Sequence, residues 1–140
     1  MTNFIQESSI PNRVIITTAR GPGIQQFLYQ VQVFTVPGGL SVGQGKAKLV
    51  FPGAVTLSKV RASVGTAPLG SEVTIDVNKN GITVFTNQTN RPKIYAGEST
   101  VTAIPAVTTI SPEDYLTIDI DTVGSVFSGE NLTVQIEVTP

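Results

Sequence analysis

Strict alternation of apolar and polar residues, in several short runs, is the feature that most constrains how this chain can fold. It is clearest in "YLTIDIDTV" (115–123) and "NLTVQIEV" (131–138). Successive side chains of a β-strand point to opposite faces, so these runs predict strands with one buried and one solvated face. The predicted core residues of these two strands are Leu116, Ile118, Ile120, Leu132, Val134, Ile136 and Val138.

The rest of the composition agrees with a fold made of strands. Val, Thr and Ile are abundant, and β-branched side chains fit a pleated sheet better than a helix. No window longer than two helical turns carries apolar residues at i, i+3, i+4 and i+7. We therefore predict an all-β protein.

Turn residues divide the chain into strands. In "TIDVNKNGITVF" (74–85) the pair Asn80-Gly81 interrupts the alternation, and both residues tolerate the positive φ of a type I′ hairpin turn. About eight strands separated by such turns predict a sandwich or a barrel. The predicted strands cover residues 27–36, 45–51, 55–64, 73–78, 82–86, 100–103, 116–123 and 132–138.

Residues 1–23 have a different pattern. A few apolar residues are scattered among polar ones, and Pro11 cannot donate a hydrogen bond within a central strand. One short strand is predicted at 14–18. We predict an extended N-terminal arm (1–23) followed by a β-sandwich domain (24–140), with a frayed terminus as the alternative interpretation of the arm.

The residue inventory argues against catalysis. The chain has no His and no Cys, which removes the usual general base near neutral pH, the commonest transition-metal ligand and all thiol chemistry. A Ser-His-Asp arrangement is therefore impossible. We predict a protein that is not an enzyme and that needs no cofactor and no metal.

Acidic residues on the predicted strands leave a calcium site or a catalytic carboxylate pair open as an alternative. Asp119 and Asp121 are two residues apart and share a strand face, with about 6.6 Å of rise between them. Together with Asp76 or Glu137 they could form a calcium site or a glycosidase carboxylate pair. The loops supply few further acidic ligands, so a solvated sheet face is the favoured interpretation.

Basic residues recur at the same spacing in three pairs. Cross-strand pairing with the acidic residues is their favoured role, and contact with an acidic protein surface or a glycan is the alternative. The pairs are Lys46 and Lys48, Lys59 and Arg61, and Arg91 and Lys93.

The overall charge argues against nucleic-acid and membrane partners. Nine basic and ten acidic residues give a net charge of −1, too small to attract nucleic acid or an anionic membrane. No apolar run approaches the roughly 20 residues that span a bilayer. The first residues carry no secretory signal pattern, so we expect a soluble protein made and used without secretion.

Four short motifs resemble a module of tailed-bacteriophage virion surface proteins. They are "ASVGTAP" (62–68), "DVNKNG" (76–81), "NRP" (90–92) and "IDIDTVGS" (118–125), and the resemblance covers about residues 34–138. It implies a jelly-roll-like antiparallel β-sandwich of the kind found in tail fibres, receptor-binding tips and capsid decorations. Such proteins are usually homotrimers without enzymatic activity.

Among these virion roles, the short chain favours a capsid decoration or cement protein, because a tail fibre needs a long shaft. The expected location is the outer capsid surface, after synthesis in the host cytoplasm, and the expected partner is the major capsid protein. The arm would grip the shell by strand addition, strengthened when three copies bind together. Its predicted contact residues are Phe4, Ile5, Ile10, Val14, Ile15 and Ile16.

The main alternative is a tail-fibre or tail-tip domain that binds a receptor or a glycan. Tyr95 or Tyr115 would then be candidates for stacking on a sugar ring. A glycan-binding module outside any virus, or a small enzyme, is a further alternative.

Overall fold

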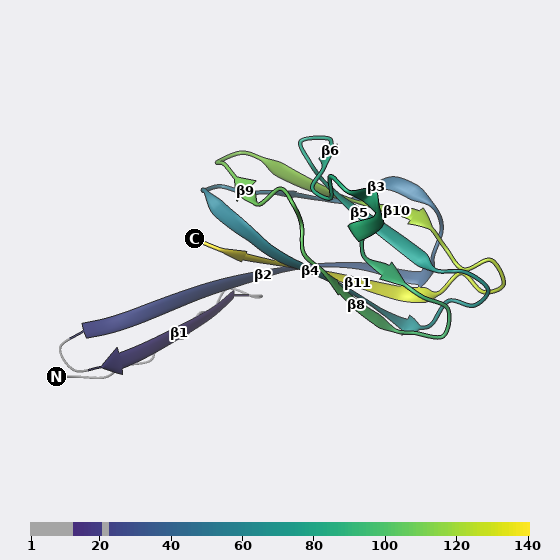
Figure 1. Cartoon of the computed structure of the whole chain (residues 1–140), viewed down its shortest axis with the longest axis horizontal. Coiled ribbons are helices and arrows are strands. Elements are labelled where there is room, and N and C mark those ends of the chain that lie inside the picture. Colours follow the sequence, from purple (N-terminus) through teal and green to yellow (C-terminus); the bar gives the residue numbers. More distant parts are fainter. Residues whose placement is uncertain (1–12, 21–22) are drawn as a thin grey trace.

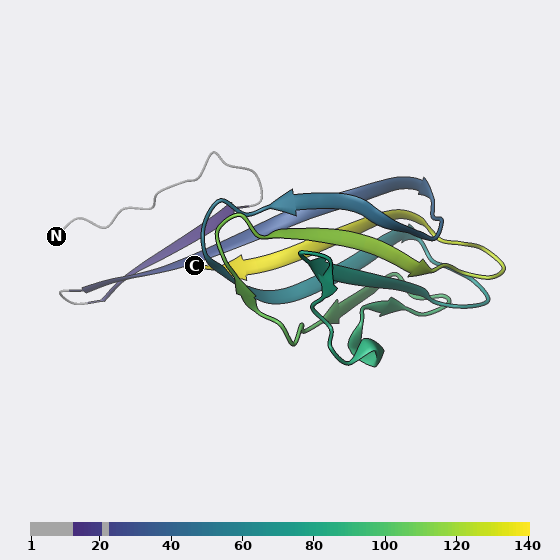
Figure 2. The ribbon, with the colours of Figure 1, turned by 90° about the horizontal axis from the view of Figure 1, so that it is seen from above.

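The computed structural model describes the backbone of residues 13–20 and 23–140, and the side chains from residue 30 onward. Two antiparallel sheets pack face to face, and a long strand pair extends from one of them (Figure 1 and Figure 2). None of the described residues forms a helix long and apolar enough to cross a membrane. The elements are β1 (Arg13–Arg20), β2 (Gly23–Gly39), β3 (Gly43–Val50), β4 (Val55–Thr66), β5 (Val73–Lys79), β6 (Ile82–Thr83), the 3₁₀-helix η1 (Gln88–Asn90), β7 (Lys93–Ile94), β8 (Thr100–Ala103), β9 (Thr109–Ile110), β10 (Tyr115–Thr122) and β11 (Glu130–Thr139).

The order of the strands confirms the predicted fold class. The first sheet has the order β1-β2-β11-β4-β8, with β9 also on β4, and the second has the order β3-β10-β5-β6, with β7 also on β5. From β2 to β5, each strand lies in the opposite sheet from the one before it, and the chain crosses again from β8 to β10 to β11. Such repeated crossing between two antiparallel sheets makes the sandwich a jelly roll.

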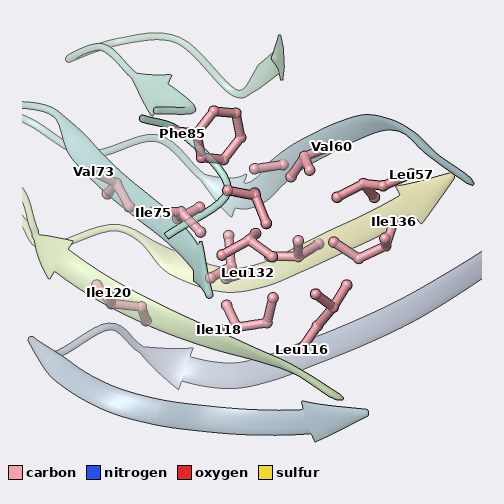
Figure 3. Packing of buried hydrophobic residues seen from close by; sticks show 14 of the residues in the cluster. Leu57, Val60, Val73, Ile75, Phe85, Leu116, Ile118, Ile120, Leu132 and Ile136 are labelled. Atoms are coloured by element: carbon pink, nitrogen blue, oxygen red, sulfur yellow. The ribbon is translucent and has the colours of Figure 1, made fainter. Parts of the chain in front are cut away.

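The core lies between the two sheets (Figure 3). All seven core residues predicted from β10 and β11 are at most 1% exposed, so that prediction is confirmed. Each fully buried aliphatic side chain of this kind stabilises the fold by about 1.5–3 kcal/mol relative to an exposed one. The alternating residues of β10 and β11 thus bury one face of each sheet against the other.

The turn in "TIDVNKNGITVF" is the predicted hairpin. Asn80 and Gly81 have φ values of 51° and 87°, as a type I′ turn requires. The return strand is shorter than predicted, because β6 ends at Thr83 rather than at residue 86. Val84 and Phe85 are both buried, and two consecutive inward side chains end the alternation of a strand.

The other predicted strands are all present. The strand predicted at 100–103 matches β8 at both ends, and the others have shifted ends. Two strands of two residues each, β7 and β9, were not predicted, because such short pairings carry no periodic signal. Strand β2 is longer than the predicted 27–36. It runs without a break through residue 24, where the sandwich domain was expected to begin.

Candidate functional site

A two-stranded ribbon at the N-terminal end is the first candidate for an interaction site. Strand β1 pairs with β2 from Arg13↔Gln30 to Arg20↔Gly23, whereas β11 pairs with β2 only between Gln30 and Gly39. The pairing partner of β2 therefore changes at Gln30. On the far side of this point, β1 and β2 project from the sandwich as a ribbon (Figure 1).

The predicted contact residues fall into two groups. Three of them lie in β1, where the register is Val14↔Tyr29, Ile15↔Leu28 and Ile16↔Phe27. The other three, Phe4, Ile5 and Ile10, lie outside the residues that the structure describes. The geometry thus places half of the set in the ribbon, and the contact role of all six remains a prediction.

Two strand edges border the same flank of the sandwich. In the part of the chain that the structure describes, β3 pairs only with β10, and β2 beyond Gln30 pairs only with β11. Such edges can accept an extended peptide. Partly buried apolar side chains of these two strands pack against the core beside the edges: Phe34, Val36, Ala47 and Leu49.

The acidic residues of the proposed calcium or carboxylate site are not brought together as one group. Glu137 lies on β11 in the first sheet, whereas Asp76, Asp119 and Asp121 lie on β5 and β10 in the second. The Arg91 guanidinium lies 2.6 Å from Asp121. Among the described residues, no group of three or more Asp or Glu side chains could hold a metal ion.

Asp76 and Asp119 face each other across β5 and β10, and each has its own hydrogen-bond donors. The Oδ1 atom of Asp76 accepts bonds from the Thr83 hydroxyl (2.6 Å) and the Val77 amide (2.9 Å). Burial raises the pKa of Asp76, and the Thr83 hydrogen bond opposes that shift. Two donors from its own sheet therefore hold Oδ1 of Asp76 in place.

Two of the six basic residues, Arg61 and Arg91, pair with acidic residues as the favoured interpretation expected. Arg61 lies 2.8 Å from Glu137 across β4 and β11. The Lys48 ammonium lies 4.3 Å from the centre of the Tyr115 ring, which is a cation–π contact. Tyr95, the other tyrosine considered for sugar stacking, is 54% exposed after β7.

A polar hollow on the outer side of the second sheet was not predicted. The pairing of β10 with β3 jumps from Ile118↔Ala47 to Ile120↔Gly43, so three residues of β3 lie opposite Asp119. This bulge borders a hollow of about 250 Å³. Glycines within a strand pattern, as in "GQG" (43–45), are the signal that could have revealed it. The hollow is lined by Gln44, Gly45, Asn78, Gly81, Thr117 and Asp119.

Comparisons with known proteins place the fold but not a family. No protein-family model matches the chain, and the curated proteins contain no match to it. Among solved structures, the chain is similar to a chain of the cyanophage Pam1 capsid asymmetric unit, with a TM-score of 0.55 and 12% sequence identity. The alignment covers 96% of this chain and 99% of that chain. At this identity the likeness establishes a common fold over nearly the whole length.

Proposed function

We propose that this chain is a non-enzymatic structural protein of a bacteriophage virion, and specifically a decoration or cement protein on the outer face of the head. The observation that carries the proposal is the whole-length similarity to a chain of a phage capsid asymmetric unit. Because the alignment covers almost all of both chains, the two chains have similar lengths. A single sandwich of this size and topology therefore occurs within a phage capsid.

The extent of the alignment also bears on the N-terminal arm. Residues 24–140 are 117 of the 140 residues, or about 84% of the chain. The alignment covers 96% of the chain. The similarity therefore extends into the residues before 24. This supports the proposal that the arm, as well as the sandwich, has a role in the capsid.

The ribbon is the part of the chain best suited to attachment. A two-stranded hairpin is marginally stable by itself in water, and β1 leaves one backbone edge without a partner among the described residues. Strand addition to a shell subunit would satisfy that edge, and apolar residues such as Val14, Ile15 and Ile16 would supply specificity. In a homotrimer, binding of one arm would hold the other two close to the shell at a high effective concentration, so three weak contacts would give strong attachment.

The test is binding of the purified protein to emptied phage heads, followed by counting the bound copies per particle. The proposal predicts saturable binding, with copies spread over the shell and none on isolated tails. A tail-fibre or tail-tip receptor domain, the alternative, predicts a few copies confined to the tail. The second outcome would overturn the decoration role while leaving a virion role in place.

A matched pair of variants tests the role of the ribbon. Replacing Val14, Ile15 and Ile16 together by Ser should weaken shell binding at least tenfold. The control replaces three exposed apolar residues of the sandwich by Ser, namely Val42, Leu69 and Val126, which are 61%, 49% and 79% exposed. Equal losses in both variants would contradict a specific role for β1.

A further inference from the structure

We propose that the polar hollow beside the β3 bulge binds one sugar ring of a glycan. This inference does not rest on the decoration role, because a glycan site is compatible with a head or a tail location. It rests on the way the hollow is built, on the polar groups that line it, and on its size.

The hollow is held open by a specific backbone arrangement. Gly45 has a φ of 61°, a conformation that favours glycine, and its N–H donates to Oδ1 of Asp119 at 2.7 Å. Asn78 Nδ2 donates to the other oxygen, Oδ2, at 2.8 Å. Two donors from two neighbouring strands therefore fix the Asp119 carboxylate in one orientation, as a preorganised binding group requires.

Several hydrogen-bonding groups at the hollow remain available to a ligand. Each oxygen of Asp119 accepts one bond in the structure and can accept a second. The Thr117 hydroxyl, the Gln44 amide and Oδ1 of Asn78 make no hydrogen bond to any other described side chain or backbone group. The lining thus offers both donors and acceptors, which vicinal hydroxyl groups can use together.

The same lining argues against other classes of ligand. An anion would be repelled by the Asp119 carboxylate, and no Lys or Arg among the described residues lines the hollow to offset it. The nearby Lys46 ammonium bonds to the Ser41 hydroxyl at 3.2 Å. Calcium would need six to eight oxygens, and Asp119 supplies the one carboxylate that the described residues bring to the lining. A neutral, hydroxyl-rich ligand remains.

The size of the hollow sets how much of a glycan it can hold. Its volume of about 250 Å³ is below the roughly 300–1,000 Å³ of pockets for drug-sized ligands. One sugar ring fits this space, and the rest of a longer glycan would extend over the sheet.

The experiment is a glycan array with the full chain, followed by NMR titration of the ¹⁵N-labelled protein with the monosaccharide at the end of the best-bound glycan. The proposal predicts that the amide signals of Gly45 and Thr117 shift on titration. Thr117→Val keeps a β-branched side chain but removes the hydroxyl, and Asp119→Asn removes one acceptor oxygen. Each should weaken binding by about tenfold, the equivalent of 1.4 kcal/mol.

Thr102→Val is the matched control, because Thr102 is an exposed strand threonine on β8 in the other sheet. It should leave glycan affinity unchanged. Absence of any bound glycan, shifts that map away from the hollow, or equal affinity in the Thr117→Val variant and the wild type would each overturn the proposal. Shell binding is measured separately, so failure here would leave the decoration role intact.

Discussion

The N-terminal ribbon and the sandwich are built from strands of one chain, yet they are stabilised differently. In the sandwich, two sheets enclose a continuous apolar core that runs from Leu40 to Val138. In the ribbon, β1 has β2 as its one pairing partner among the described residues, and this part of β2 lies beyond the reach of β11. The sandwich can therefore be stable by itself, whereas a two-stranded ribbon gains most of its stability from a partner.

This difference agrees with the proposal that one chain combines a rigid body with an attachment ribbon. Strand β2 connects the two regions because its second half is a member of the core sheet and its first half belongs to the ribbon. Substitutions should therefore separate the regions: those in the core should lower the free energy of unfolding, and those in the ribbon should lower shell binding.

The largest expected effect on stability is at the centre of the core. Ile136 is fully buried, so Ile136→Ala should lower the free energy of unfolding by about 2–5 kcal/mol through lost burial and a residual cavity. Ile15→Ala in the ribbon should change it by less than about 0.5 kcal/mol. Urea denaturation of both variants measures the contrast, and similar losses would show that the ribbon belongs to the cooperative core.

An intermediate effect is expected at the end of the sandwich opposite the ribbon. A Cβ at Gly124 would collide with the backbone oxygens of Phe127 and Leu69, so Gly124→Ala should cost about 1–3 kcal/mol of unfolding free energy. Gly53 has open space around its position, and Gly53→Ala is the matched control. Equal stability of the two variants would mean that this tight loop packing contributes little to the rigid body.

The smallest effect concerns two carboxyl groups of the sandwich. Burial raises the pKa of Asp76, so its contribution to stability is largest below the unfolded value of about 3.9 and is lost as pH rises through its folded pKa. Asp76→Asn can keep both hydrogen bonds to Oδ1 and should become modestly more stable than wild type as pH rises to 7.

The pKa of Asp114 is shifted in the opposite direction, so its effect on stability should have the opposite pH dependence. Hydrogen bonds from Asn80 and Ser111 hold its pKa below the ordinary value, so its contribution is present above about pH 3.9 and is lost as pH falls. Asp114→Asn should therefore be less stable than wild type at pH 7 and approach it in acid. Melting temperatures between pH 3 and 7 check both signs, and parallel curves would contradict the assigned environments.

Much of the sandwich could be predicted from the sequence because alternation reports directly on burial. The core positions of β10 and β11 followed from their period of two, and the Asn80-Gly81 hairpin followed from the φ values that its turn requires. The length of β6 did not follow, because Val84 and Phe85 are buried in succession and only tertiary packing decides that.

The candidate sites were harder to predict than the fold. The spacing of Asp119 and Asp121 correctly indicated a shared strand, but it could not reveal that Arg91 approaches one and that Gly45 and Asn78 bind the other. These contacts join residues distant in sequence through a bulge and a loop. A periodic pattern carries no information on such contacts, and for the same reason the polar hollow was missed.

The most direct test of the account compares the full chain with a variant that lacks residues 1–20, using denaturation and binding to emptied heads. The truncated protein should keep its free energy of unfolding to within about 1 kcal/mol, keep its oligomeric state, and no longer bind the shell. Full occupancy of the shell by the truncated protein, or failure of its sandwich to fold, would contradict the division between a self-sufficient body and an attachment ribbon.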